Sequence, residues 1–408
     1  TKMHARYIRL ALQSAEEILP AAESFKLSGM NITSPFKEQI FNLLDSFDRN
    51  ASETGSVNTI VFKKGRKPKG FNTDVEGVKG CLEERNTEIK GARALVIGGG
   101  GAAISAAYAL ISLGADITIA NRTLDKAKRI GMMFGCEVCS LSRKDISDAV
   151  RKAEILVSAV STTKRIVPKE ALRKGTLILE AYYSNKTALS SDAIKAGCTF
   201  IGGLNWLLHQ GVISFEIMVG KKAPIAAMRK ALQKTNTLKS NIALIGFMGC
   251  GKSSISKKIS SLYSLKNLDI DEQIEKSTRQ SIPSIFKERG EEYFRRLEKK
   301  EIAKASEMRN VIISCGGGAV LNQRNMRILA KNSWIVWLHA DPKECIKRIK
   351  HEHNRPLLFH KKMFETGLRI FEERKPLYAA NCDFAICTEN KKIDDIARLI
   401  NYEISISK

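Results

Sequence analysis

A glycine-rich stretch just past the middle of the chain, GFMGCGKSS at 246–254, has the spacing of a phosphate-binding loop. It fits G-x-x-x-x-G-K-[ST] and lies between a short apolar run and a helical pattern, as a Walker A loop requires. Backbone amides would surround phosphate oxygens, the lysine would reach the β and γ phosphates, and the first serine would hold Mg²⁺. We therefore predict an ATP site, with a catalytic lysine, at Gly249, Cys250, Gly251, Lys252, Ser253 and Ser254.

Five further motifs follow this loop in a fixed order: LDIDEQI, GEEYFRRLEKKE, ISCGGGA, HNRPLL and FEERKPLY. The first places Asp269 and Asp271 two residues apart at the end of an expected strand. The triple glycine of ISCGGGA, Gly316 to Gly318, stands at the end of an expected strand, where it lets the backbone approach a ligand closely. Taken singly, an arginine in these motifs is more often a solvated helix residue. Only the whole series indicates an acceptor site.

The whole series resembles that of shikimate kinases and covers essentially all of 240–400. The resemblance implies that ATP, with Mg²⁺, phosphorylates the 3-hydroxyl of shikimate. It implies that Asp271 binds the acceptor hydroxyls and orients or deprotonates the 3-hydroxyl. Asp269 would join Ser253 in the magnesium shell.

The same resemblance assigns the remaining charged and glycine residues of this half. Arg295 and Arg374 would clamp the shikimate carboxylate, for which a guanidinium fork is well matched. Gly317 and Gly318 would contact the ring hydroxyls. Two arginines would serve the nucleotide: Arg355 closing over the phosphates and stabilising the transferring charge, and Arg348 near the adenine.

The front half carries a second glycine turn, in RALVIGGGGAAISAAYALISLGADITIANRT at 93–123. The pattern reads strand, turn, helix, strand, which is typical of dinucleotide binding. An NAD site places an acidic residue at the end of the second strand. This chain has IANRT there, whose donors and positive charge favour the 2′-phosphate of NADP. The predicted cofactor residues are Gly98, Gly100, Gly101, Ala102, Ala103, Asn121, Arg122 and Thr123, with Gly203 further along.

The motifs GMNITSPFKE, GSVNTIVF, GFNTDVEG and GLNWLLHQG, with the glycine turn, resemble shikimate dehydrogenases from about residue 29 to 220. The resemblance implies reduction of 3-dehydroshikimate to shikimate by NADPH. Lys37 and Asp74 would form the proton-handling pair, although a lysine beside a carboxylate is also often a plain salt bridge. The implied substrate contacts are Thr33, Asn58, Gln210 and Tyr183, the last of which fits a buried structural role almost equally well.

One segment departs from the dehydrogenase pattern. The family begins with a strand and a Ser-x-Ser motif for the substrate carboxylate, and TKMHARYIRLALQ at the start of this chain does not match it. Three explanations stay open: the chain is a fragment, which we favour; the front half is catalytically impaired and fused to an active kinase; or another serine, such as Ser34, compensates. The milder departures are SAVSTT near the nicotinamide, Glu180 in place of aspartate and Asn185 in place of proline.

Alternating apolar strands and helical stretches predict an α/β fold in both halves, with largely parallel sheets. We expect a substrate-binding domain at 1–90, a Rossmann NADP-binding domain with returning helices at 91–236, and a P-loop kinase domain resembling nucleoside monophosphate kinases at 237–408. Before residue 90 the candidate strands are YIRLAL, GMNIT and VNTIVF.

Composition restricts the remaining classes of function. The chain has 408 residues and a net charge of +24, which favours a basic surface over sites for anionic small molecules above nucleic-acid binding. The sequence shows neither a signal-peptide pattern nor an apolar run of about 18 residues, so we expect a cytoplasmic protein without membrane or nucleic-acid partners. Nine cysteines without metal-binding spacing predict free thiols. The oligomeric state stays open, with a monomeric kinase half expected.

Two rival interpretations belong to other classes. One is a nucleoside-type kinase joined to a dinucleotide-sensing regulator, and the other is a basic NTPase that binds nucleic acid. The arginines of the second half and the NTD motif of the first favour two consecutive shikimate-pathway enzymes over both rivals.

Overall fold

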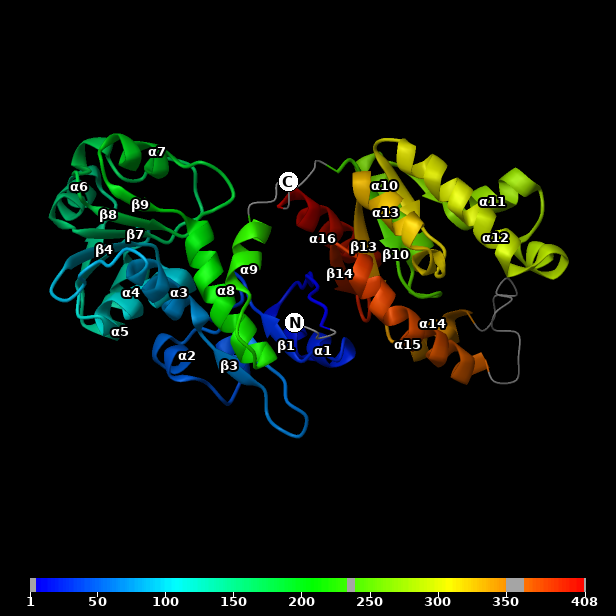
Figure 1. Cartoon of the computed structure of the whole chain (residues 1–408), viewed down its shortest axis with the longest axis horizontal. Helices are drawn as coiled ribbons and strands as arrows, with labels where there is room; N and C mark the ends of the chain where they lie inside the picture. Colours follow the sequence, from blue (N-terminus) through cyan, green and yellow to red (C-terminus); the bar gives the residue numbers. More distant parts are fainter. Residues whose placement is uncertain (1–4, 233–238, 350–362, 407–408) are drawn as a thin grey trace. The chain divides into compact units, whose positions relative to one another are not determined.

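A computed structural model describes residues 5–232, 239–349 and 363–406 (Figure 1). The chain divides into two compact units. One unit comprises Ser14–Lys234, and the other comprises Thr1–Gln13 together with Thr235–Lys408. The predicted boundary at 236 and 237 lies outside the described residues, and the boundary at 90 and 91 stays a prediction.

After helix α1 (Ile18–Ser24), the first unit has a small antiparallel sheet of order β1-β2-β3. Its strands are β1 (Gly29–Asn31), β2 (Thr59–Val61) and β3 (Lys69–Phe71). Helix α2 (Arg49–Thr54) lies between β1 and β2 in the sequence, and α3 (Thr73–Glu83) directly follows β3. Together with the sheet, they form the small lobe of this unit. The motifs GMNIT, GSVNT and GFNTD lie at the ends of these strands, so their polar side chains meet beside one sheet.

A six-stranded parallel sheet of order β6-β5-β4-β7-β8-β9 follows. Its strands are β4 (Arg93–Ile97), β5 (Asp116–Asn121), β6 (Glu137–Ser140), β7 (Ile155–Ser158), β8 (Leu177–Glu180) and β9 (Thr199–Ile201). Renumbered from β4, this is the 3-2-1-4-5-6 order of a doubly wound fold. The prediction of a parallel Rossmann sheet is thus confirmed.

Alternation along β4 shows how both faces of this sheet are covered. Ala94 and Val96 belong to one apolar cluster, and Leu95 and Ile97 belong to another. Helices lie on both sides of the sheet (Figure 1): α4 (Gly101–Ser112), α5 (Leu124–Phe134), α6 (Arg143–Lys152) and α7 (Ala188–Lys195). A strand buried on both faces needs a continuous apolar run, which RALVI provides.

The chain then returns to the small lobe through α8 (Gly203–Val219) and α9 (Ile225–Leu232). Helix α8 packs closely along α3, because α3 has glycines at the contact. A Cβ atom at Gly77 would lie 2.7 Å from Trp206 Cδ1, and one at Gly80 would lie 2.6 Å from His209 Nδ1. This close approach brings Gln210 of α8 to the N-terminus of α3.

The second unit has a five-stranded parallel sheet of order β11-β12-β10-β13-β14. The strands are β10 (Asn241–Ile245), β11 (Lys266–Asp269), β12 (Val311–Ser314), β13 (Ser333–His339) and β14 (Phe384–Cys387). The helices are α10 (Lys252–Tyr263), α11 (Ile270–Thr278), α12 (Ile282–Glu307), α13 (Gln323–Asn332), α14 (Pro342–Ile349), α15 (Met363–Asn381) and α16 (Ile393–Ser405). Each predicted strand of this half is present.

The predicted strand YIRLAL is wrong, because this segment forms only one isolated bridge, and that bridge is to the sheet of the second unit. Leu10 forms a parallel bridge with Ala385, at the outer edge of β14. The amide of Ala11 donates to the Ala385 carbonyl at 3.0 Å, and the Ala385 amide donates to the carbonyl of Arg9 at 2.8 Å. Arg9 also pairs with Glu403. The open edge of β14 offers these backbone partners, which a sequence pattern does not reveal.

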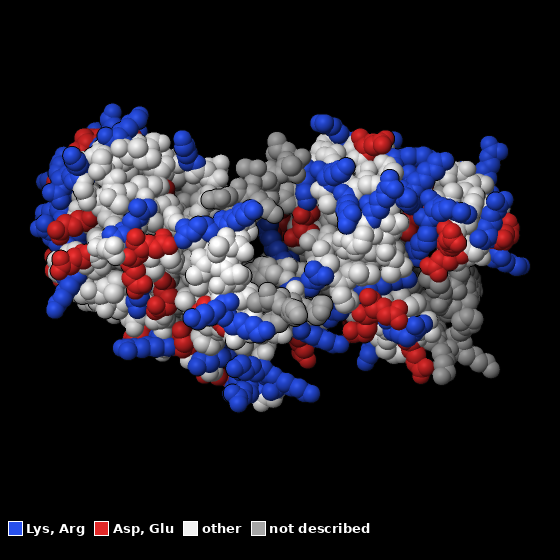
Figure 2. Space-filling model, in the orientation of Figure 1, with Lys and Arg blue, Asp and Glu red and all other residues white. Residues whose placement is uncertain are grey.

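The surface and the cysteines agree with the composition. Lysine and arginine side chains occur on both units and are interspersed with acidic ones on the face shown in Figure 2. All nine cysteines are free, as predicted. Within the described residues, no helix is both long and apolar enough to cross a membrane.

Candidate active sites

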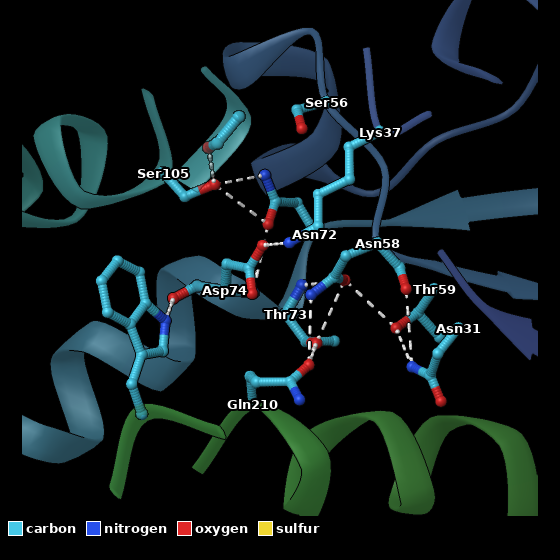
Figure 3. A network of polar contacts seen from close by, with 12 residues as sticks. Asn31, Lys37, Ser56, Asn58, Thr59, Asn72, Thr73, Asp74, Ser105 and Gln210 are labelled. Atoms are coloured by element: carbon cyan, nitrogen blue, oxygen red, sulfur yellow. Dashed lines mark hydrogen bonds and ion pairs between the residues drawn. The ribbon is translucent and has the colours of Figure 1, made fainter. Parts of the chain in front are cut away.

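The first candidate site contains the predicted Lys37–Asp74 pair. Lys37 Nζ lies 2.5 Å from Asp74 Oδ2 (Figure 3), and both side chains are largely shielded from water. Asp74 is in the first turn of α3, whose N-cap residue Asn72 accepts a hydrogen bond from the Asp74 amide. The indole of Trp206 donates to the Asp74 carbonyl at 3.1 Å. Asn72 and Trp206 therefore fix the backbone of Asp74, which carries the carboxylate.

Asn58 and Gln210 lie beside this pair, joined through Thr73. Asn58 Oδ1 accepts hydrogen bonds from the Thr73 amide at 2.8 Å and from the Thr59 hydroxyl at 3.1 Å. Asn58 Nδ2 donates to Gln210 Oε1 at 3.3 Å (Figure 3). Because Asn58 Oδ1 already accepts these hydrogen bonds, the Nδ2 group of Asn58 serves the site as a donor. The structure thus brings together four of the predicted residues, Lys37, Asn58, Asp74 and Gln210.

The two other predicted substrate contacts are more exposed. Thr33 lies in the turn after β1, where its carbonyl accepts from the Phe36 amide, one residue before Lys37. Tyr183 follows β8 and is 53% exposed, which excludes the alternative of a buried structural tyrosine. Its loop approaches α8, because a Cβ atom at Gly203 would lie 2.5 Å from the Ala181 carbonyl oxygen.

The predicted cofactor turn joins β4 to α4. Gly100 caps α4, so the first amides of that helix, at Gly101, Ala102 and Ala103, point out of its N-terminus. A Cβ atom at Gly99 would lie 2.7 Å from Asn121 Nδ2, so the end of β5 borders the turn. Arg122 and Thr123 follow at the exposed surface. This arrangement fits a pyrophosphate at the helix N-terminus and a 2′-phosphate beside Arg122.

The second candidate site is built around the loop between β10 and α10. Lys252 is 9% exposed, and its ammonium donates to the carbonyls of Gly246 at 3.0 Å and Phe247 at 2.8 Å. Ser253 donates to Asp269 Oδ2 at 2.7 Å. Asp269 also caps α11, because its Oδ1 accepts from the amide of Asp271. Ser253 and Asp269 are therefore in contact at the position where the magnesium site is predicted.

An acidic and basic cluster lies next to this loop. Arg295 Nη1 contacts both carboxylate oxygens of Glu298, at 3.1 and 3.0 Å, and Arg295 Nη2 contacts Glu291 at 2.9 Å. A Cβ atom at Gly316 would lie 2.9 Å from Glu298 and 3.1 Å from Asp271 Oδ1. A side chain at Gly318 would overlap the Arg295 guanidinium. The triple glycine therefore leaves room for these charged groups to converge.

Burial changes the acid–base properties of this cluster. Glu298 is 1% exposed, and burial raises its pKa to about 7, against the opposing effect of Arg295. Burial also raises the pKa of the Cys315 thiol and of the Tyr378 hydroxyl. The sequence does not indicate this burial, because GEEYFRRLEKKE has the pattern of an ordinary charged helix face.

Helix α15 contributes to the same site. Arg374 is 6% exposed, and its Nη1 would lie 3.8 Å from a Cβ atom at Gly317. Tyr378, one turn further along, donates to the Gly317 carbonyl at 2.7 Å. Tyr378 was not predicted, although its place four residues after Arg374 puts both on one helix face. The triple glycine is therefore held between α12 and α15.

A pocket of about 410 Å³ lies at the phosphate loop, and the predicted residues Arg295, Gly318 and Arg374 are not part of its lining. Its lining includes the predicted residues Gly249, Cys250, Gly251, Lys252, Ser253, Ser254, Asp269, Asp271, Gly317 and Arg348. Thr388 and Lys391, after β14, line it as well and were not predicted. Arg348 Nη1 approaches the Gly249 carbonyl at 3.4 Å. The predicted Arg355 lies outside the described residues.

The donors near the phosphate loop fit a magnesium ion that is completed by nucleotide phosphates. Ser253 and Asp269 offer oxygen ligands, which Mg²⁺ prefers, and Mg²⁺ usually takes only one or two protein ligands in such sites. No group of three or more His, Cys, Asp or Glu residues suited to a metal occurs in the described parts of the chain. A cage made of protein ligands alone is thus absent from those parts.

Comparison with known families matches both halves. The family "Shikimate kinase" matches residues 248–404. The families "Shikimate dehydrogenase substrate binding domain", "Shikimate / quinate 5-dehydrogenase" and "Shikimate 5'-dehydrogenase C-terminal domain" match residues 1–60, 81–179 and 203–233. The matches follow the same order as the two units.

Individual relatives give the same division. A "Shikimate dehydrogenase (NADP(+))" of Carboxydothermus hydrogenoformans is 36% identical over 56% of this chain and 87% of its own length. A "Shikimate kinase" of Dictyoglomus turgidum is 40% identical over 39% of this chain and 94% of its own length. The crystal structure of shikimate dehydrogenase from Aquifex aeolicus is 31% identical, covers 54% of this chain and 82% of that chain, and has a TM-score of 0.50.

Fold and sites together define a two-part enzyme, a Rossmann-type oxidoreductase followed by a P-loop kinase. The chain belongs to the shikimate dehydrogenase family in its front half and to the shikimate kinase family in its second half, and is a fusion of the two.

Proposed function

We propose that the second unit transfers the γ-phosphoryl group of ATP to the 3-hydroxyl of shikimate. The observation that carries this proposal is the convergence of Asp271, Arg295 and the triple glycine beside the phosphate loop. Asp271 takes the proton of the attacking hydroxyl as its oxygen forms the new bond to phosphorus, and ADP leaves. Arg295 and Arg374 bind the substrate carboxylate and so align the ring for in-line transfer.

Lys252, Ser253 and Asp269 serve the phosphates in this proposal. The Lys252 ammonium exchanges its carbonyl partners for phosphate oxygens, which carry more charge. Ser253 and Asp269 would hold Mg²⁺, which would supply positive charge beside the leaving phosphates. Arg348 borders the nucleotide, and Arg355 completes the predicted set.

We propose that the first unit reduces the ring ketone of 3-dehydroshikimate to shikimate. The supporting observation is the Lys37–Asp74 pair beside the amides of Asn58 and Gln210. The Lys37 ammonium donates a proton to the carbonyl oxygen as that oxygen becomes a hydroxyl, and Asp74 holds the lysine in place. Asn58, Gln210 and Thr33 bind ring substituents, and Tyr183 covers the site from the β8 side.

NADPH supplies the hydride for this reduction when it is bound. The amides at Gly101, Ala102 and Ala103 hold its pyrophosphate, supported by the close turn at Gly98 and Gly100. Asn121, Arg122 and Thr123 bind the 2′-phosphate, and Gly203 lets the loop after β8 close against α8. These positions explain a preference for NADP over NAD, because none of them carries an acidic side chain.

Two assays on the same purified chain test the proposals. NADP reduction with shikimate reports the first unit, and ADP release with shikimate and MgATP reports the second. Lys37→Ala is expected to lower the first rate by at least about 100-fold and to leave the second unchanged. Lys252→Ala is expected to do the reverse.

The outcome of these assays also separates the two forms of the proposal. Activity in both assays establishes a bifunctional enzyme. ADP release without NADP reduction contradicts the dehydrogenase proposal and leaves an active kinase fused to an impaired dehydrogenase domain. Stimulation of ADP release by nucleosides but not by shikimate contradicts the kinase proposal.

A further inference from the structure

A buried hydrogen-bond network connects Asp74 to the helix of the cofactor turn. Asn72 is 1% exposed and lies directly before α3. Its Oδ1 accepts from the Asp74 amide at 3.1 Å. Its Nδ2 donates to Thr54 Oγ1 at 2.8 Å and to Ser105 Oγ at 2.9 Å (Figure 3). Ser105 is on α4, the helix that begins at the glycine turn.

The hydrogens in this network fix the orientation of the Asn72 amide. The Thr54 hydroxyl donates to the Asn50 carbonyl at 2.6 Å, and the Ser105 hydroxyl donates to the Gly101 carbonyl at 2.8 Å. Both hydroxyl oxygens therefore act as acceptors toward Asn72, and both Nδ2 hydrogens are used. The Ser105 oxygen also lies 3.3 Å from Asn72 Oδ1, but its single hydrogen is used by the closer Gly101 carbonyl, so the amide oxygen of Asn72 is left to cap the Asp74 amide.

Ser105 reaches this network from the part of α4 that borders the Lys37 side chain. Its hydroxyl bonds to Gly101, the first residue of α4. A Cβ atom at Gly101 would lie 3.5 Å from Lys37 Cβ, so the lysine stem passes along the turn. One serine thus contacts the backbone of the cofactor turn directly and, through Asn72, the backbone of Asp74.

We propose that Ser105 is a positioning residue for the Lys37–Asp74 pair, acting through Asn72. The Ser105 oxygen is one of two acceptors that hold the Asn72 amide, and Asn72 sets the first turn of α3. This inference rests on the dehydrogenase function proposed above. Without the Ser105 oxygen, a buried N–H loses its partner, which is costly, and Asn72 shifts to recover one. A small displacement of Asp74 then slows the chemical step, because proton transfer depends on geometry.

The test is Ser105→Ala in the full chain. We expect kcat for shikimate oxidation to fall about tenfold, with KM for NADP changed by less than about twofold. In the reverse direction, NADPH deuterated at the transferring position is expected to give a larger primary isotope effect than in the unchanged protein. Loss of folded protein alone leaves the isotope effect as it was. The kinase activity of the same molecule measures the amount of enzyme independently of the first unit.

Ser112→Ala is the matched control. Ser112 is on the same helix, and its hydroxyl donates to the Ala109 carbonyl at 2.7 Å, so the change removes the same chemical group. It is expected to alter neither kcat nor the isotope effect. Thr54→Val removes the other acceptor of Asn72 and is expected to act like Ser105→Ala. It carries the test if the Ser105 variant does not fold.

Two results would count against the proposals, and they are distinguishable. If Ser105→Ala and Ser112→Ala have the same kcat and isotope effect, the positioning role of Ser105 is wrong. If the unchanged chain does not reduce NADP with shikimate, the dehydrogenase function itself is wrong, before any variant is compared.

Discussion

Glu298 shows how a single buried carboxyl group links stability to the acceptor site of the kinase. It lies between Arg295 and the triple glycine, where water is excluded. Burial disfavours its charged form, whereas Arg295 favours it, and burial has the larger effect. Near neutral pH the Glu298–Arg295 contact therefore changes between a hydrogen bond to a neutral acid and an ion pair.

This balance predicts a pH dependence of unfolding. The pKa of Glu298 is about 7 in the folded state and near the ordinary 4.5 in the unfolded chain. Between these values the folded state binds more protons, so stability falls as pH rises from about 4.5 to 7, by roughly 3 kcal/mol. Glu298→Gln removes this dependence, because the amide does not titrate.

The measurement is urea unfolding of the kinase unit at several pH values between 5 and 8, in the unchanged protein and in the Glu298→Gln variant. The free energy of unfolding of the unchanged protein should fall relative to that of the variant as pH rises. Glu291→Gln removes the other carboxylate contact of Arg295 and serves as the control for a lost pairing alone. A difference between the Glu298 variant and the unchanged protein that is constant over this range would contradict the prediction.

Arg295 carries a second prediction at the same scale. Arg295→Lys keeps the charge but loses the planar fork that matches a carboxylate. We expect KM for shikimate in the kinase assay to rise about 10- to 100-fold, the loss of a charge-assisted hydrogen bond, with KM for ATP nearly unchanged. Arg296→Lys, at the exposed neighbouring position, is the matched control. Equal effects of the two variants would remove Arg295 from the acceptor site.

At the scale of elements, a break in α12 places both Arg295 and Glu298. Gly290 interrupts this helix with φ 76° and ψ 173°, in a region that is essentially restricted to glycine. No atom lies within 4 Å of a Cβ atom built there, so space does not explain the glycine. The backbone conformation does, and it redirects the helix before its charged residues reach the triple glycine.

Gly290→Ala is therefore expected to destabilise the kinase unit by about 1–3 kcal/mol through backbone strain. It should also raise KM for shikimate, because relief of the strain rotates the segment that carries Arg295. Thermal unfolding and the ADP-release assay measure the two effects. Lys287→Ala, in the exposed part of α12 before the break, should change neither. An alanine variant as stable as the parent would refute the strain argument.

The elements also show what the sequence could and could not predict. Strands such as RALVI and SWIVWLHA were predictable because an apolar run of that length needs burial on both faces. The phosphate loop was predictable because its chemistry is local. The cluster around Gly316 was not derivable from spacing, since α12 and β12 meet only through tertiary packing. Asn72 had a recognisable cap signal before α3, but its partner Ser105 comes from another lobe.

At the scale of the whole molecule, each candidate site is built by one unit. Lys37, Asn58, Asp74 and Gln210 all belong to Ser14–Lys234. The phosphate loop and acceptor cluster belong to the unit that contains Thr235–Lys408. Residues 9–11 are joined to the kinase sheet at β14, although a dehydrogenase family description covers them. Long-range backbone pairing of this kind leaves no local pattern in a sequence.

Because the site residues that the structure describes come from a single unit in each case, two singly inactivated chains should complement each other. We expect an equal mixture of Lys37→Ala and Lys252→Ala proteins to convert 3-dehydroshikimate, with NADPH and ATP, to the phosphorylated product. After a lag in which shikimate accumulates, the rate of product formation by the mixture should be within about twofold of the parent rate, measured with parent protein at the concentration of one variant. The reason is that independent sites share a free intermediate. Alone, the Lys37 variant should form shikimate at least about 100-fold more slowly, and the Lys252 variant should accumulate it. The contradicting outcome is a mixture that stays below about one tenth of the parent rate, although the Lys37 variant keeps normal kinase activity and the Lys252 variant keeps normal dehydrogenase activity. Shikimate would then have to pass within one molecule, and the units would not act independently.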